Sequence, residues 1–140
     1  MRFLITAGAG HESRPIRESE IGADMLAAYM KFNEEMHKAG ILVASEGLTP
    51  GAPGARVVVS GGKRKVLDGP FAESKELVGG FYLIDVPSLD VAVSWALRCP
   101  TGLGSDDILE IRQLTGEGDV PPEILEIIKR AAPNWSKTWK

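Results

Sequence analysis

The acid and base chemistry that this sequence can offer begins with Asp68, which opens the turn Asp68-Gly69-Pro70-Phe71. Glycine and proline supply the backbone angles of a sharp turn, and the aspartate can accept hydrogen bonds from backbone amides of that turn. If Phe71 excludes water from the carboxylate, burial raises its pKa and makes it a usable general base at the mouth of a ligand site. We favour the turn role over the base, because aspartates in turns are common and strongly raised pKa values are not. The two roles are compatible.

Glu46 and Tyr29 are the other candidate catalytic residues. Glu46 alternates with Leu42 and Ala44, so a strand here places a carboxylate on an otherwise apolar face. A buried carboxylate requires a partner, and such a pair is as consistent with a structural role as with catalysis. The candidate partners are the polar side chains of Lys75, Arg112 and Tyr29. A tyrosine can donate a hydrogen bond or act as a weak acid, but it is a poor base near neutral pH.

Strands and two helices are expected to position these residues. Apolar and β-branched runs predict strands over residues 2–7, 41–45, 56–60, 64–67, 81–86 and 108–114. Gly61-Gly62-Lys63 separates the third and fourth strands and indicates a hairpin. Ser19 caps a first helix that runs to about Lys38, and Ser88 caps a second helix that ends before Pro100.

This order of elements predicts an α+β fold, with a ferredoxin-like sheet, two covering helices and an inserted β-hairpin. Phe81 and Trp95 are predicted core residues. The first helix presents an apolar stripe at helical spacing, made of Ile21, Met25, Ala28, Phe32 and Met36. Helices on one face leave the other face of the sheet apolar and exposed. Either a second copy or the C-terminal helix is expected to cover it.

Residues 116–140 follow the predicted domain of residues 1–115 and differ from it in character. Pro121-Pro122 can open a short helix. Its apolar side consists of Ile124, Leu125, Ile127, Ile128 and Ala131, and a tail with Trp135 and Trp139 follows. We expect this helix to pack on its own domain or on a dimer partner rather than on another protein.

Composition argues against several classes of protein. The 140 residues carry a net charge of -3 with acids and bases interspersed, so neither nucleic acid nor a membrane is an expected partner. No apolar run approaches the ~20 residues of a membrane span, and the first ten residues do not read as a signal peptide. We therefore expect a cytoplasmic protein. Cys99 is expected to be a buried structural thiol, and the spacing of His11 and His37 predicts no metal site.

Three stretches carry a family resemblance: residues 29–42, residues 45–50 and residues 66–86. The last of these resembles the DGPF signature of the YCII-related family, and the three occur in the family's order. The resemblance implies kinship with the dimeric α+β barrels, and hence a symmetric homodimer. Two departures limit what can be carried over. Members commonly have a lysine where this chain has Thr6-Ala7-Gly8, and the histidine thought to act in shorter relatives falls near Tyr29.

The resemblance implies a first hypothesis for function. Related barrels include isomerases, lyases and monooxygenases without cofactors, so this chain is expected to be a cofactor-independent enzyme acting on a small molecule. The site would lie between the helical layer and the sheet, where Asp68 or Glu46 moves a proton. Tyr29 or Arg112 would stabilise the developing charge. The expected ligand-binding residues are Phe71, Lys75 and Arg112.

A second hypothesis is a ligand-binding or regulatory module without catalysis. Proteins of the DGPF type often accompany sigma factors of the extracytoplasmic-function class, which implies a regulatory partnership. A third is a purely structural dimer. Polar residues on apolar strands favour the first two hypotheses, because an enzyme or a binder needs fixed polar groups at its site.

Overall fold

The structure is a computed structural model that describes residues 1–8, 22–48, 54–68, 78–100 and 108–136. Its strands are β1 (Arg2–Gly8), β2 (Leu42–Gly47), β3 (Ala55–Ser60), β4 (Lys63–Asp68), β5 (Val78–Asp85) and β6 (Ile108–Gln113). Its helices are α1 (Ala23–Lys38), α2 (Leu89–Ala96), α3 (Pro122–Ala131) and α4 (Pro133–Ser136), with a short 3-10 turn at Glu117–Asp119 before α3.

Four strands form an antiparallel sheet in the order β2-β5-β1-β6, and β3 and β4 form a separate two-stranded hairpin. β1 is central, because it pairs with β5 on one side and with β6 on the other. Removing the hairpin from the element order leaves strand-helix-strand repeated twice, the ferredoxin-like plan. The predicted fold class and the inserted hairpin are therefore confirmed.

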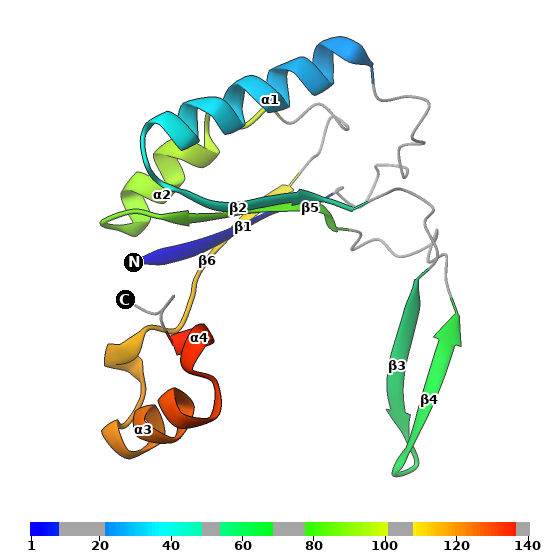
Figure 1. The fold of residues 1–140 in the computed structure, drawn as a ribbon. Helices are drawn as coiled ribbons and strands as arrows, with labels where there is room; N and C mark the ends of the chain where they lie inside the picture. Colours follow the sequence, from blue (N-terminus) through cyan, green and yellow to red (C-terminus); the bar gives the residue numbers. More distant parts are fainter. Residues whose placement is uncertain (9–21, 49–53, 69–77, 101–107, 137–140) are drawn as a thin grey trace.

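Helices α1 and α2 cover one face of this sheet (Figure 1). Strand alternation turns Phe3 and Ile5 of β1 and Ile84 of β5 toward these helices, where all three are buried. Phe32 and Met36 of α1 are also buried, as their helical spacing predicts. The core residues are Phe3, Ile5, Phe32, Met36, Tyr82, Ile84, Val86, Ala92 and Ala96.

The prediction that Phe81 belongs to this core is wrong. Tyr82 is the residue that points toward the helices, and Phe81 lies half-buried on the opposite side of the sheet. Residues 81–86 are apolar on both faces, so their hydrophobicity alone does not reveal which alternate set turns inward. Trp95 is half-buried and packs against the core, with its ring 6.2 Å from that of Phe32.

The helix boundaries follow local signals. The Ser88 hydroxyl accepts a hydrogen bond from the Val91 amide at 3.3 Å, which confirms Ser88 as the cap of α2. Gly40 follows α1 with a φ of 72°, a conformation that glycine adopts without strain. The predicted cap Ser19 lies outside the described residues, in which α1 begins at Ala23.

Two segments extend from the sheet on the side away from α1 and α2 (Figure 1). The first is the β3–β4 hairpin, called here the hairpin, whose tip has Gly61 and Gly62 at φ values of 57° and 74°. Positive φ at two consecutive residues is the geometry of a tight hairpin turn, so the glycine signal is confirmed. The second is residues 117–136, called here the C-terminal arm, in which α3 packs against α4.

Candidate functional site

The face of the sheet turned away from α1 and α2, called here the open face, gathers several of the predicted site residues. One row across the strands consists of Glu46, Phe81, Thr6 and Glu110, and the next row consists of Ala44, Leu83, Leu4 and Arg112. The residues of β5 and β1 in these rows are half-buried, and the three charged residues at the edges are exposed. The open face therefore has an apolar centre with charged groups at its margins.

Glu46 is at the β2 margin of this face, directly opposite Phe81. A bulge between Leu42 and Ala44 shifts the register, so Leu42 pairs with Ile84 on the covered side while Ala44 and Glu46 lie on the open side. The expectation that all three share one face is wrong for Leu42, because the extra residue reverses the alternation. The expected burial of Glu46 is also absent, since its side chain is exposed in the single chain.

Backbone contact with Gly80 fixes the strand at Glu46. A Cβ atom at Gly80 would lie 2.8 Å from the Glu46 carbonyl oxygen and 3.3 Å from the Cα atom of Gly47. These neighbours are backbone atoms, which cannot rotate away as a side chain would. Only glycine at position 80 lets β2 and β5 approach this closely, so Gly80 positions the carboxylate of Glu46.

Arg112 shares the open face with Glu46 but lies on the far edge strand. Three strand spacings of about 4.8 Å separate β2 from β6, which puts the two backbones on the order of 14 Å apart. Glu110 is nearer to Arg112, two residues away on the same face of β6. Within one chain the structure therefore does not bring Arg112 to Glu46 as a charge partner.

Tyr29 lies on the other side of the sheet. It is half-buried in α1 and packs against the core beneath the helices. Because Glu46 faces the opposite way, one site between the helices and the sheet cannot contain both side chains of a single chain. The predicted catalytic residues therefore separate into two places on the molecule.

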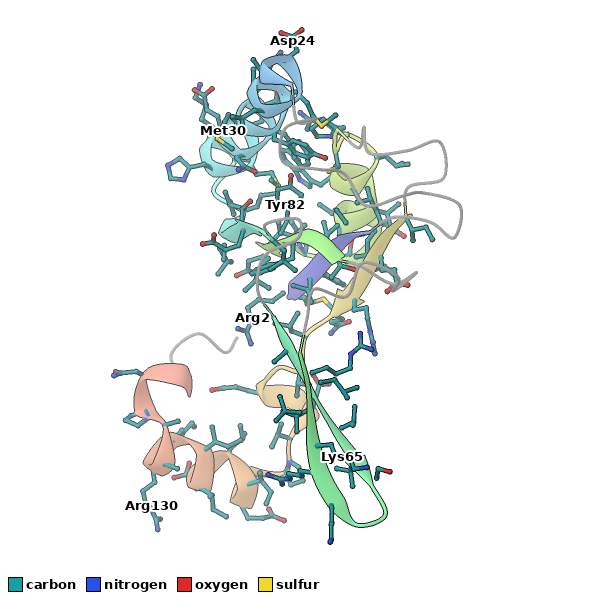
Figure 2. All side chains as sticks on the ribbon, turned by 90° about the vertical axis from the view of Figure 1, so that its right-hand side faces the viewer. Arg2, Asp24, Met30, Lys65, Tyr82 and Arg130 are labelled. Atoms are coloured by element: carbon teal, nitrogen blue, oxygen red, sulfur yellow. The ribbon has the colours of Figure 1, made fainter. Side chains whose placement is uncertain are left out.

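Tyr82, Cys99 and Tyr29 form a polar cluster within the covered layer. The Tyr82 ring lies between α1 and the sheet (Figure 2) and meets Phe32 edge to face, with ring centroids 5.4 Å apart. Burial raises the pKa of the Tyr82 hydroxyl well above its usual range, and its hydrogen bond with Cys99 and the nearby Tyr29 add to this. Tyr82 is therefore a neutral group. The sequence pattern placed Tyr82 in an apolar strand without a role of its own, although a hydroxyl group within an apolar run indicates a buried polar contact.

Cys99 behaves as a structural thiol. It is half-buried beside the core, and burial raises the pKa of its thiol. A raised pKa keeps the sulfur protonated near neutral pH, whereas a nucleophilic cysteine needs the thiolate. The prediction of a structural rather than a reactive cysteine is consistent with this environment.

Asp68 is the last residue of β4, where its backbone pairs with Ala55 at the base of the hairpin. The hairpin lies beyond the end of the sheet where β2 stops and β5 begins (Figure 1). Phe71 and Lys75 lie outside the described residues, and their roles remain predictions.

The described residues contain no group of three or more His, Cys, Asp or Glu side chains that could hold a metal ion. Among the helices of that same part of the chain, none has both the length and the apolar character required to cross a membrane.

Comparison with known proteins identifies the family of this chain. A family model described as the YCII-related domain matches residues 1–115. An uncharacterized protein of Rhizobium meliloti (strain 1021) is 37% identical over 97 residues, which cover 69% of this chain and 75% of that protein. Among solved structures, the chain is similar to 5-chloro-2-hydroxyhydroquinone dehydrochlorinase (TftG) from Burkholderia phenoliruptrix AC1100 in complex with 2,5-dihydroxybenzoquinone. That alignment has a TM-score of 0.42 and 19% identity, and it covers 86% of this chain and 100% of the other.

The match over residues 1–115 spans β1 to β6 and ends before the C-terminal arm. It includes every predicted site residue. By this match and by its identity with the Rhizobium protein, the chain belongs to the YCII-related domain family.

Proposed function

We propose that this YCII-related protein is a homodimer joined through the open faces of two sheets, and that it is a cofactor-independent enzyme acting on a small molecule. A carboxylate, Glu46 or Asp68, moves a proton in an isomerase-like or lyase-like reaction. The observation that carries the proposal is the position of Glu46 beside Phe81 at the margin of a half-buried apolar face.

Pairing of open faces explains the arrangement of that face. The half-buried Leu4, Phe81 and Leu83 lose contact with water when a second apolar face covers them, which stabilises the dimer by roughly 25 cal/mol per Å². The exposed charges at the margins can stay in water. Glu46 would then lie at the border between the apolar interface and solvent.

The proposed reaction needs no oxidant and no external acid. The carboxylate removes a proton from a carbon next to a carbonyl group of the substrate, and the electron pair moves onto the carbonyl oxygen as an enolate. If the substrate has a conjugated double bond, returning the proton to the far end of that system completes an isomerisation. If the carbon next to the deprotonated one carries a leaving group, the electron pair returns to form a double bond and the group departs as an anion, which completes a lyase reaction. Arg112 remains a candidate for stabilising the enolate oxygen, because it lies on the open face, although it does not meet Glu46 within one chain. Tyr29 lies beneath the helices on the other side of the sheet, so pairing of the open faces does not bring it to Glu46.

The test begins with a thermal-shift screen of small carbonyl and lactone compounds and with mass spectrometry of compounds that copurify. For each compound that is turned over, Glu46→Gln and Asp68→Asn are compared with native protein. Loss of the base should lower turnover by about 10²–10⁴-fold while the fold survives. Glu110→Gln is the matched control, because it removes a carboxylate from the same face on the far strand.

Three results would contradict the proposal in different ways. If light scattering at micromolar concentration reports a monomer, the proposed pairing of open faces is contradicted. If turnover is unchanged in both the Glu46 and the Asp68 variants, the proposed proton transfer by a carboxylate is contradicted. Binding without turnover of any bound compound would favour the second hypothesis, a regulatory or ligand-binding module that acts through a protein such as a sigma factor.

A further inference from the structure

One face of the hairpin presents exposed apolar side chains. Val57 pairs with Val66 and Val59 pairs with Arg64, so these four side chains lie on one face of the two-stranded ribbon. The three valines are 61–72% exposed. An isolated two-stranded hairpin is only marginally stable in water, so contact with another surface would stabilise this one.

Helix α3 carries an exposed apolar pair beside an acidic residue. Leu125 and Ile128 are half-buried, whereas Ile124 and Ile127 are 43% and 58% exposed. Glu123 borders this pair at Ile127, because it lies one helical turn before Ile127 on the same side of α3. An apolar pair beside a carboxylate thus faces outward from the C-terminal arm.

The net charges of the two segments are also complementary. The basic residues of the hairpin are Arg56, Lys63, Arg64 and Lys65, against the single acid Asp68. The acids of the C-terminal arm are Glu117, Asp119, Glu123 and Glu126, against the bases Lys129 and Arg130. Opposite charges favour contact between the hairpin and the arm, whereas two hairpins would repel each other.

Within one chain the two surfaces are separated. The hairpin and α3 extend from opposite ends of the sheet (Figure 1), and in the perpendicular view Lys65 of the hairpin and Arg130 of α3 also lie apart (Figure 2). Both extend toward the side of the open face, which is the side where the proposed partner would lie. A second copy could therefore meet both segments at once.

We propose that the hairpin of each protomer docks on α3 of a second copy of this chain. Val57, Val59 and Val66 pack on Ile124 and Ile127, and Arg64 pairs with Glu123. Two-fold symmetry repeats the contact, so each copy gives one hairpin and receives one. The inference rests on the homodimer in the proposed function and adds a second, exchanged interface to it.

Cysteine cross-linking tests the contact directly. In a Cys99→Ser background, chains carrying Val59→Cys are coexpressed with chains carrying Ile127→Cys and are oxidised mildly. The expected product is a covalent dimer that contains one chain of each kind. Val58→Cys is the matched control, because Val58 pairs with Lys65 on the other face of the hairpin and should not cross-link to Ile127→Cys.

Other products would overturn the exchange. A covalent dimer of Val59→Cys chains alone would show that hairpin meets hairpin. A chain carrying both cysteines that closes on itself as a monomer would show that the arm binds its own hairpin. If no cross-link forms and light scattering still reports a dimer, the pairing of the sheets stands and only the exchange of hairpins is contradicted. If light scattering reports a monomer, both proposals are contradicted.

Charge reversal supplies an independent measurement. Arg64→Glu or Glu123→Arg alone should raise the dimer dissociation constant about tenfold, because symmetry applies each change twice. The double variant Arg64→Glu/Glu123→Arg should restore most of the affinity. Lys65→Glu makes the same change in charge on the other face of the hairpin and should alter the constant by no more than about twofold. An equal effect of the Arg64 and Lys65 variants would show that net charge, and not this contact, governs association.

Discussion

The two faces of the four-stranded sheet are built from the same strands and differ in what covers them. Every fully buried large side chain of the described residues lies between the covered face and its helices, where burial raises the pKa values of Tyr82 and Cys99 and keeps both groups neutral near pH 7. The open face has a half-buried apolar centre with Glu46, Glu110 and Arg112 exposed at its margins. The covered face therefore supplies stability to a single chain, whereas the open face is the side on which we propose association and chemistry.

The largest expected effect is on the covered face. Phe32→Ala removes a ring that meets both Tyr82 and Trp95, and it should lower the free energy of unfolding by ~3–5 kcal/mol. Leu83→Ala on the open face should cost the monomer far less and should instead weaken the dimer. Urea unfolding and light scattering of both variants check this. Equal losses of monomer stability would show that the two faces are not functionally distinct.

The next largest effect on stability is expected at Gly80, whose backbone packs closely against that of β2. Gly80→Ala places a Cβ against the Glu46 carbonyl and should cost about 1–3 kcal/mol through displacement of β2. Gly47→Ala is a direct control, because Gly47 pairs with Gly80 and a Cβ there meets nothing within 4 Å. Thermal unfolding of both variants distinguishes the close contact from a general effect of replacing glycine in a strand.

A smaller effect should appear at high pH. Burial raises the pKa of Tyr82, so the folded protein holds the phenol proton more tightly than the unfolded chain, in which tyrosine titrates near pH 10. The stability that depends on this proton is complete below about pH 10 and is lost as the pH rises further. Tyr82→Phe should abolish that part of the decline in urea midpoints between pH 9 and 11. An unchanged slope in the variant would show that other groups cause the decline.

The smallest effect concerns a reaction rate. Because burial raises the pKa of Cys99, alkylation of native protein by iodoacetamide at pH 8 should be slow, and urea should accelerate it at least about tenfold. Mass spectrometry of the modified chain over time measures the rate. Rapid modification of folded protein would mean that solvent reaches the covered layer.

Sequence patterns predicted the elements well, because caps, turn glycines and apolar runs are local signals. Ser88 and the Gly61-Gly62 pair each perform the local function expected of them. It was harder to predict which side chains point to which face of the sheet. A bulge after Leu42 changes which side chains turn inward, and no local pattern announces one.

The candidate site was difficult to predict for the same reason, because the face on which each side chain lies decides which residues meet. Glu46 and Tyr29 were each reasonable choices from residue type, but whether they meet depends on which face the helices cover. Residues 81–86 are apolar on both faces, so the inward set could not be chosen, and Tyr82 was passed over in favour of Phe81. Asp68 remains a prediction from turn chemistry.

The central place of β1 has a consequence for the order in which the protein can form. β1 is the first strand along the chain, yet its two neighbours are β5 and β6, so the amide of Leu114 bonds to the carbonyl of Arg2 across the length of the domain. Contacts between residues so distant in sequence slow folding. During synthesis, β1 must remain without its neighbours until nearly the whole domain has emerged. Its apolar residues are then exposed to other chains, which makes low temperature or chaperone coexpression the natural choice for producing this protein.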